Sequence, residues 1–297
     1  MLHTTQGLHL VAACRNVLVP LDGSREAEAA LGIGQWLARC FGAELHLVIA
    51  DVRSIDRYWY VPYLKTVAGE ALPAIPHWTD DRDVVGAIRA TARDLDPCVV
   101  CIATHGRSRT AAVLGSTFAH LAITGDDPLV AIGPRPSLPV GPDARRTVVC
   151  LEPGPSTTLS ERLVDRAAMW ARAFGHSLTL VTAAHGDDKA VAEEEVERLA
   201  RDPGLDDLAV DGLVLEGPGG PHVALPRHLA DHPATFLATA PHGRTGAGRA
   251  LLGSETARII RHSPIPVLVV PPPPTHRWST ALAGRPGTPA AGRPGGG

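Results

Sequence analysis

An internal repeat constrains the fold of this chain more than any other feature of its sequence. The segment Ala38–Gly42 and the apolar run after it recur 133 residues later as Ala171–Gly175 and a second apolar run. Further matches follow in the same order at offsets of 137 to 138 residues: His105–Arg107 with His242–Arg244, Gly115–Ser116 with Gly253–Ser254, and Pro128–Ile132 with Pro266–Val270. Matches that keep their order and spacing indicate a duplication. A chain of 297 residues can hold two domains of about 140 residues each.

Each copy is predicted to alternate strands with helices. In the first copy we expect strands at 16–21, 45–50, 99–103 and 129–132, with helices at 26–41, 83–95 and 116–123. In the second copy we expect strands at 147–151, 178–183, 235–240 and 267–270, with helices at 159–174 and 254–261. Short apolar runs between helices are typical of buried parallel strands joined by right-handed crossovers. The predicted class is α/β, with about five parallel strands in each copy.

The expected domains are residues 15–134 and 146–271. A segment rich in proline and glycine joins them, and residues 272–297 have the composition of a disordered tail. Residues 53–80 are predicted to be an irregular connection, and they hold every tyrosine of the chain. Their aromatic side chains either form a patch for a partner or ligand, or cover an edge of the core.

Composition excludes several classes of protein. A formal net charge of −3 gives no overall electrostatic footprint for nucleic acid. No run approaches the roughly 20 apolar residues that a membrane-spanning helix needs. Five scattered cysteines do not form a disulfide framework, so we expect a soluble cytoplasmic protein. Cys98 and Cys101 have the spacing of a redox or zinc motif, but on a strand they would point to opposite faces, so no metal site is expected.

The predicted binding site lies where the strands end. In an open parallel sheet, ligands bind at the carboxyl ends of the strands, where the strand order reverses. Asp22 follows the first strand, His105–Arg107 follow the 99–103 strand, and Gly115–Ser116 open the last helix of the first copy. A helix N-terminus attracts anions, so Gly115 and Ser116 either hold a phosphate or cap the helix.

These residues resemble the universal stress protein family. The resemblance rests on Val17–Ser24, His105–Arg107 and Leu114–Ser116 in the first copy, and on Pro241–Arg244 and Leu251–Ser254 in the second. It implies Rossmann-like domains of the adenine-nucleotide α-hydrolase type, packed as a pseudo-dimer within one chain through their last strands. It leaves open a homodimer of the whole chain.

The family resemblance also implies a ligand, ATP or a related adenine nucleotide, in one or both domains. The residues predicted to contact it in the first copy are Pro20, Leu21, Asp22, Ile49, Ala103, Gly106, Arg107, Gly115, Ser116 and Thr117. Those predicted in the second copy are Glu152, Thr182, Ala240, Gly243, Arg244, Gly253, Ser254, Glu255 and Thr256. No catalytic residue and no metal ligand are predicted.

Both copies depart from the family's pattern Gly-x2-Gly-x9-Gly-Ser/Thr. Ala103 and Ala240 replace its first glycine, and only eight residues separate Gly106 from Gly115. The second copy keeps nine residues in its loop but carries Glu152 in place of the aspartate. The sequence therefore favours the second copy if only one binds, because a phosphate loop is harder to replace than one carboxylate.

The leading hypothesis is an ATP-binding regulatory protein of the stress response that is not an enzyme. One alternative is a protein-interaction module that has lost nucleotide binding, and another is a slow ATP hydrolase. No protein partner is indicated by the sequence.

Overall fold

The computed structural model describes residues 14–50, 57–68, 73–105, 115–124, 128–134, 144–152, 158–184, 186, 188–217, 220–241 and 252–270. The predicted tail at 272–297 lies outside these residues, as does most of the segment that joins the two copies.

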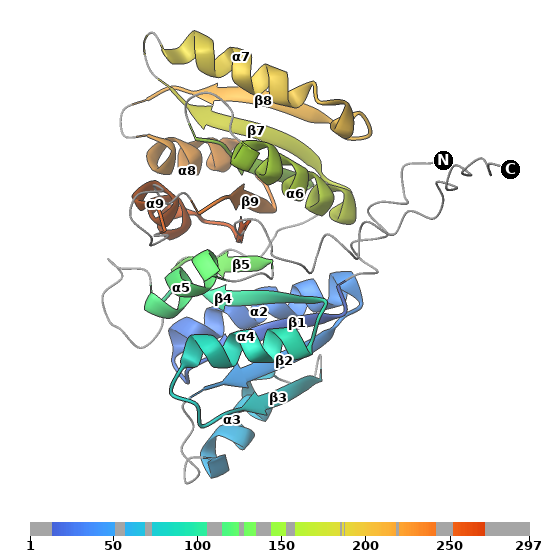
Figure 1. Ribbon diagram of the computed structural model, residues 1–297, viewed down its shortest axis with the longest axis vertical. Helices are drawn as coiled ribbons and strands as arrows, with labels where there is room; N and C mark the ends of the chain where they lie inside the picture. Colours follow the sequence, from blue (N-terminus) through green and yellow to red (C-terminus); the bar gives the residue numbers. More distant parts are fainter. Residues whose placement is uncertain are drawn as a thin grey trace, which may run out of the picture.

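A single ten-stranded sheet runs through the described part of the molecule, with the strand order β3-β2-β1-β4-β5-β10-β9-β6-β7-β8 (Figure 1). The strands are β1 (Asn16–Leu21), β2 (Glu44–Ile49), β3 (Ala74–Trp78), β4 (Cys98–Ala103), β5 (Leu129–Ile132), β6 (Arg146–Cys150), β7 (Ser177–Ala183), β8 (Val210–Leu215), β9 (Phe236–Thr239) and β10 (Val267–Val269). The helices are α2 (Arg25–Phe41), α3 (Arg57–Ala68), α4 (Val84–Asp94), α5 (Ser116–Thr124), α6 (Thr158–Phe174), α7 (Asp188–Ala200), α8 (Pro221–Asp231) and α9 (Ser254–His262).

The sheet consists of two halves with the same topology. Strands β1 to β5 form the first half and strands β6 to β10 the second, and all strand pairs within each half are parallel. The two halves meet at β5 and β10, which pair antiparallel with Val130 opposite Leu268. The predicted α/β class with a mostly parallel sheet is confirmed.

The strongest segment of the sequence repeat ends the first helix of each half. Gly42 follows α2 with φ 63° and Gly175 follows α6 with φ 64°. This left-handed conformation suits glycine, and it lets the next N–H groups return to the helix. The N–H of Ala43 bonds to the Ala38 carbonyl at 2.9 Å, and the N–H of His176 bonds to the Ala171 carbonyl at 2.8 Å. Both predicted helix ends are confirmed.

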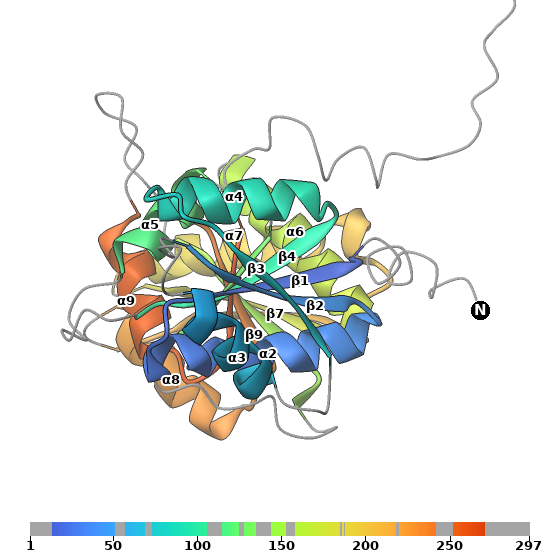
Figure 2. The same cartoon turned by 90° about the horizontal axis from the view of Figure 1, so that it is seen from below.

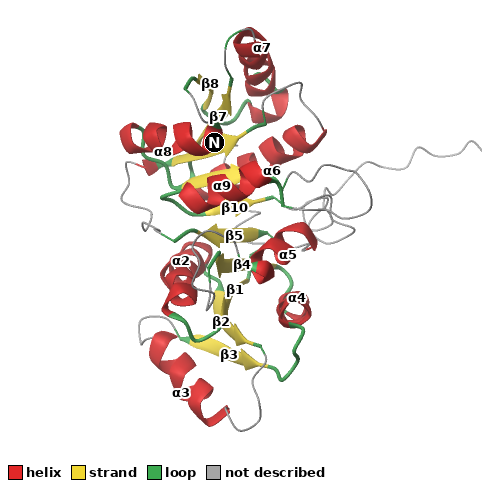
Figure 3. Ribbon diagram, turned by 90° about the vertical axis from the view of Figure 1, so that its left-hand side faces the viewer, coloured by secondary structure: helices red, strands yellow, loops and turns green. Residues whose placement is uncertain are grey.

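Helices cover both faces of the sheet (Figure 3). Side chains of α2 and α6 share one buried cluster with residues of the central strands, and side chains of α4, α5, α8 and α9 share another on the opposite face. Viewed along the long axis, the strands fan about it as a twisted sheet should (Figure 2). Cys98 and Cys101 lie in different clusters, so their thiols point to opposite faces as predicted.

An aromatic cluster joins the two halves on the α2 and α6 face. The rings of Trp36 and Phe174 stack with centroids 5.4 Å apart, and Phe41 meets Phe174 edge to face at 5.2 Å. The pairing of β5 with β10 forms the seam between the two halves. At this seam Gly133, directly after β5, lies close to α9, and an added Cβ would be 2.9 Å from the Ile260 carbonyl oxygen. The contact between the halves therefore includes both apolar area and a close backbone approach.

The prediction of an irregular connection at 53–80 was wrong. This segment contains α3 and the edge strand β3, which pairs with β2. The alternation of β3 is weak because Pro76 stands in its centre and its side chains are only partly buried. The aromatic residues divide between the two predicted roles, since Tyr60 and Tyr63 pack on the core while Tyr58 is 84% exposed and Trp59 is 79% exposed.

Candidate functional site

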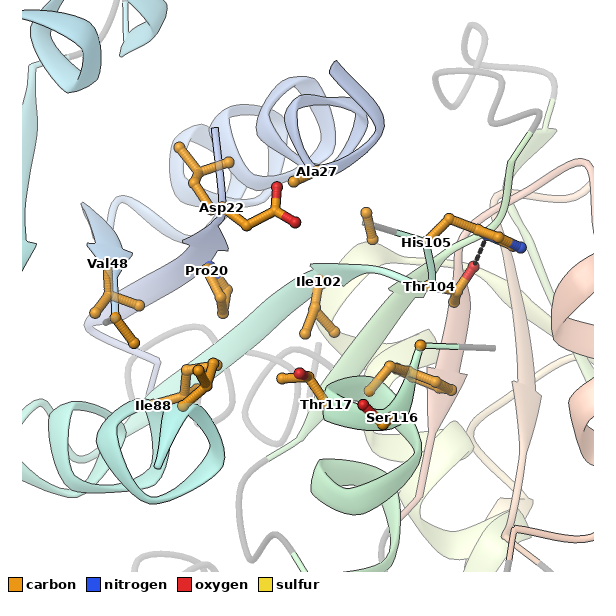
Figure 4. A pocket seen from close by; sticks show the side chains of 16 residues that line it. Pro20, Asp22, Ala27, Val48, Ile88, Ile102, Thr104, His105, Ser116 and Thr117 are labelled. Carbon is orange, nitrogen blue, oxygen red and sulfur yellow. Dashed lines mark hydrogen bonds between the residues drawn. The ribbon is translucent and has the colours of Figure 1, made fainter. Parts of the chain in front are cut away.

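A cavity opens in the first half at the point where the strand order reverses. Strand β1 lies between β2 and β4, so the chain crosses from one side of β1 to the other. The carboxyl ends of β1 and β4 diverge here, as expected at a topological switch point. The cavity has a volume of about 200 Å³. It is shown in Figure 4.

One side of the cavity is apolar. The side chains of Val48 from β2, Ile88 from α4 and Ile102 from β4 line it together with Pro20 from β1. Ile88 is 2% exposed and Val48 is 1% exposed, so this wall belongs to the rigid core. Such a wall suits a flat apolar group better than a charged one.

Polar groups line two other parts of the cavity. The Asp22 carboxylate projects from the end of β1, and Figure 4 shows the hydroxyl groups of Ser116 and Thr117 across the cavity from it. Asp22 is held in place because its Oδ1 accepts hydrogen bonds from the N–H of Ser24 at 2.9 Å and from the Ser24 hydroxyl. Ser24 in turn caps α2 by accepting from the N–H of Ala27. The carboxylate is thus oriented before any ligand arrives.

The N-terminus of α5 faces the same cavity. The Gly115 carbonyl accepts from the N–H of Ala119 at 3.0 Å, so the first turn of the helix starts at Gly115. The N–H of Gly115 itself bonds to the Thr104 carbonyl at 2.8 Å, which ties this turn to the end of β4. The positive end of the helix dipole is therefore directed at the cavity opposite Asp22.

His105 lies at the edge of the cavity in a fixed orientation. The Thr104 hydroxyl is 3.1 Å from the Ile132 carbonyl, to which it donates. The same hydroxyl therefore accepts from His105 Nδ1 at 2.8 Å, which places the proton of a neutral ring on Nδ1. His105 is 8% exposed. These hydrogen bonds give His105 a structural role at the end of β4.

Most of the predicted site residues of the first copy come together at this cavity: Pro20, Leu21, Asp22, Ala103, Gly115, Ser116 and Thr117 line it. Ala103 is the last residue of β4, paired with Ile132, so its backbone is extended and alanine replaces glycine there without strain. Gly106 and Arg107 lie outside the described residues.

Ile49 does not line the cavity with its side chain. Its side chain lies in the core cluster on the α2 face and is 1% exposed. Its neighbours Val48 and Ala50 line the cavity instead. Side chains alternate between the faces of a strand, so an error of one residue moves the predicted contact to the wrong face. The alternation of β2 contained the signal, but the sequence did not show which face the cavity opens on.

Most of the other residues that sequence reasoning missed in this cavity are apolar. They are Ala27, Val48, Ala50, Val84, Ile88, Ile102 and Phe118, and the polar Thr104 was missed as well. Apolar residues near strand ends resemble any other core residues in a sequence, so only the topology identifies them.

The corresponding residues of the second half are arranged differently. Thr182 is buried in the sheet with its hydroxyl lacking a hydrogen-bond partner, and Glu152 is exposed at the end of β6. Gly253 precedes α9, and Ser254 is exposed without capping the helix. Gly243 and Arg244 lie outside the described residues.

Two polar side chains in the first turn of α9 are bonded to the protein itself. The Thr256 hydroxyl donates to the Ala240 carbonyl at 3.0 Å. Glu255 Oε1 accepts from the backbone N–H of His222 at 3.1 Å and lies 2.8 Å from His222 Nδ1. These contacts use the groups that were predicted to touch a ligand.

Residues 144–271 match the model described as the Universal stress protein family. The match lies in the second half. A search of curated proteins found no match.

Solved structures resemble a larger part of the chain. A universal stress protein from Archaeoglobus fulgidus DSM 4304 is 18% identical, with a TM-score of 0.60 over 86% of this chain and 96% of that one. A functionally unknown protein from Pseudomonas aeruginosa PAO1 is 16% identical, with a TM-score of 0.62 over 89% and 95%. A protein from strain UCBPP-PA14 of the same species is 17% identical, with a TM-score of 0.63 over 89% and 95%. At these identities the likeness establishes a shared fold.

Within the described residues, no helix is long and apolar enough to span a membrane, and no group of histidine, cysteine and acidic residues could hold a metal ion.

Proposed function

We propose that this chain is a universal stress protein whose first half binds an adenine nucleotide such as ATP as a regulatory ligand, without a catalytic step. The observation that carries the proposal is the cavity at the switch point of the first half. It has an apolar wall, an oriented Asp22 carboxylate and the N-terminus of α5 around one space. The family match of residues 144–271 supports the family part of the proposal.

Each part of the cavity suits one part of a nucleotide. The wall of Val48, Ile88 and Ile102 accommodates the base, and the Asp22 carboxylate accepts hydrogen bonds from sugar hydroxyls. The phosphates would lie at the N-terminus of α5, where Ser116 offers a hydroxyl. The volume of about 200 Å³ is below the ~300–1,000 Å³ typical of enclosed ligand pockets, so it suits the base and sugar, with the phosphates outside.

The proposed half differs from the one that the sequence favoured. The loop spacing pointed to the second copy, but there the contact between Glu255 and His222 joins the first turns of α9 and α8. We therefore assign the ligand to the first half.

The proposal includes a pseudo-dimer within the chain. The antiparallel pair β5 and β10 and the stacked rings of Trp36 and Phe174 support it, because they join two halves of equal topology. The proposed domain limits remain 15–134 and 146–271, one domain for each half. A cytoplasmic protein is the setting in which ATP would be available to this site.

Isothermal titration calorimetry with ATP tests the function, using GTP to test the base. Asp22→Asn keeps the oxygen that accepts from Ser24 but removes the charge. Loss of a charge-assisted hydrogen bond, about 1.5–3 kcal/mol, should weaken ATP binding by about 10- to 100-fold. The matched control is Glu152→Gln at the equivalent position of the second half, which should leave the affinity unchanged.

Two results would contradict the proposal: absence of ATP binding by the wild-type protein at millimolar nucleotide, or equal affinities in wild type and Asp22→Asn. Release of inorganic phosphate at the rate of the buffer blank is expected, and turnover above it would favour a slow ATP hydrolase.

The exposed aromatic residues of α3 favour a second candidate function, a protein-interaction module. Tyr58 and Trp59 are almost fully exposed, which is unusual for side chains of this size. This function predicts purified protein without nucleotide and no thermal shift on adding ATP.

A further inference from the structure

The second half contains a contact that has no equivalent in the first. Glu255 in the first turn of α9 reaches across to the first turn of α8, where its Oε1 meets both the backbone N–H and the ring of His222. The two helices lie side by side at this end of the sheet (Figure 1). In the repeat, Ser254 corresponds to Ser116, so Glu255 stands where the first half has the cavity residue Thr117.

The contact supplies a cap that α8 lacks in its own sequence. The residue before this helix is Gly220, which has no side chain to cap the exposed N–H groups. Glu255 from another helix accepts from one of them, the N–H of His222, and a carboxylate is a favourable partner for a helix N-terminus. In the first half, α4 has its own cap, because the Asp83 side chain accepts from the N–H of Gly86 at 3.0 Å. Thr117 is not needed for that purpose and lines an open cavity.

Charge also differs between the two clefts. Strand pairing places Cys150 in β6 where Pro20 lies in β1, since Cys150 faces Val181 as Pro20 faces Val48. Burial, followed by the negative charges of Glu255 and Glu152, raises the pKa of the Cys150 thiol to about 12. In the second half two carboxylates therefore act on Cys150, the residue that corresponds to Pro20, while the first cavity is lined by one carboxylate, Asp22.

We propose that Glu255 is the residue that closes the second half to nucleotides, by bridging α9 to the first turn of α8. The inference rests on the proposed function of the first half, because it treats the second cleft as a closed copy of that site. A nucleotide entering there would have to displace a carboxylate from two hydrogen bonds and approach a second one. The chain therefore holds one nucleotide, in its first half. In the second half, Glu255 stays bonded to His222.

The decisive variant restores the first-half residue at this position, Glu255→Thr. Calorimetric titration with ATP should give one site per chain for wild type and two for Glu255→Thr. Glu255→Gln is the matched control, because its amide oxygen still accepts from the His222 N–H while the charge is lost, and it should keep one site. If Glu255→Thr fails to fold, Glu255→Ala opens the same cleft.

Hydrogen exchange supplies a readout that does not depend on the first half. Loss of the cap in Glu255→Thr should speed exchange of the His222 amide by about fivefold, and Glu255→Gln should change it less.

The outcomes separate this inference from the proposed function. Two sites in wild type would overturn the inference, as would one site in Glu255→Thr with faster exchange at His222. No site in wild type but one in Glu255→Thr would overturn the assignment to the first half and keep Glu255 as the closing residue. Binding by none of the proteins would overturn both.

Discussion

The first and second halves of the molecule share a strand order but differ in what occupies the cleft at the switch point. In the first half, α4 is capped by its own Asp83, and an open cavity lies between Asp22 and α5. In the second half, α8 depends on Glu255 from α9, and the cap crosses the cleft. A single helix cap therefore separates an open site from a closed one within the same fold.

The interiors of the two halves differ as well. In the first, His46 Nε2 lies 2.9 Å from Asn16 Oδ1, and His46 Nδ1 lies 2.9 Å from His77 Nε2. These bonds link β1, β2 and the edge strand β3. The equivalent residue in the second half is Thr179, whose buried hydroxyl lacks a hydrogen-bond partner. The halves have thus diverged in their polar interior groups while keeping the apolar frame.

Disrupting the seam between the two halves should cause the largest loss in the free energy of unfolding. In Gly133→Val the new side chain would meet the backbone of α9, with its Cβ 2.9 Å from the Ile260 oxygen and 3.3 Å from the Ser263 oxygen. Backbone atoms yield little, so we expect a loss of about 3 kcal/mol in the free energy of unfolding. Urea unfolding followed by circular dichroism measures it.

Gly115→Ala is the control for this prediction, because its added Cβ meets only the Thr104 oxygen at 3.4 Å. A change within about 0.5 kcal/mol is expected. Equal losses in the two variants would show that the close approach of β5 to α9 does not stabilise the molecule.

Acid should reveal a group that only the second half carries. Burial, and then the charge of Arg145, lowers the pKa of His176 to about 4. A histidine whose pKa is lowered by folding stabilises the fold fully above its unfolded pKa of about 6.5, and the contribution is lost as the pH falls through the folded pKa. Between pH 7 and pH 4 the loss from this one group is about 3 kcal/mol.

His176→Phe should therefore reduce the acid sensitivity of the protein. Its stability should fall less than that of wild type between pH 7 and pH 4, as measured by urea unfolding at each pH. Burial also lowers the pKa of His46 and His77, but both histidines are present in wild type and in His176→Phe, so their contributions cancel in the difference. His120→Asn, a change at an exposed position of α5, is the control. Parallel pH curves for His176→Phe and wild type would contradict the account.

The smallest predicted effect concerns the helix α3. The Tyr63 hydroxyl donates to Glu28 Oε1 at 2.8 Å and ties α3 to α2 in the first half. Tyr63→Phe removes this hydrogen bond and should lower the free energy of unfolding by about 1 kcal/mol. Tyr58→Phe, at an exposed position of the same helix, should leave it unchanged. The prediction fails if the two variants have equal thermal melting temperatures.

Sequence reasoning succeeded where a feature was local or repeated. The helix ends at Gly42 and Gly175 were predictable because a left-handed cap requires a particular residue. The first strand and the last strand of the first copy were predicted at their observed limits, since short apolar runs between helices allow few alternatives. The residues after β1 and before α5 were placed in one cavity because parallel strands end at the same edge.

Sequence reasoning failed where the outcome depended on packing between segments. Strand β3 was missed because an edge strand needs no apolar alternation. The side chain of Ile49 faces away from the cavity, and this was not predictable because only the assembled sheet shows where the cavity opens. Glu255 gave no signal of its partner, because His222 lies 33 residues away on another helix. The loop spacing therefore favoured the second half, because the sequence did not show the contact between Glu255 and His222.

The family match and the open cavity lie in different halves, residues 144–271 for the match and β1, β4 and α5 for the cavity. Sequence similarity reflects the core residues and the loop spacing. Ligand binding depends on which side chains line the cavity. The better-matched half need not be the binding half.

Photoaffinity labelling tests the central claim that the first half carries the nucleotide. The intact protein is irradiated with 8-azido-ATP, with and without excess ATP, and the labelled peptides are identified by mass spectrometry. We predict ATP-protected label in peptides that contain the cavity residues, within 20–50, 84–105 or 115–118. ATP-protected label confined to residues 144–270 would contradict the account.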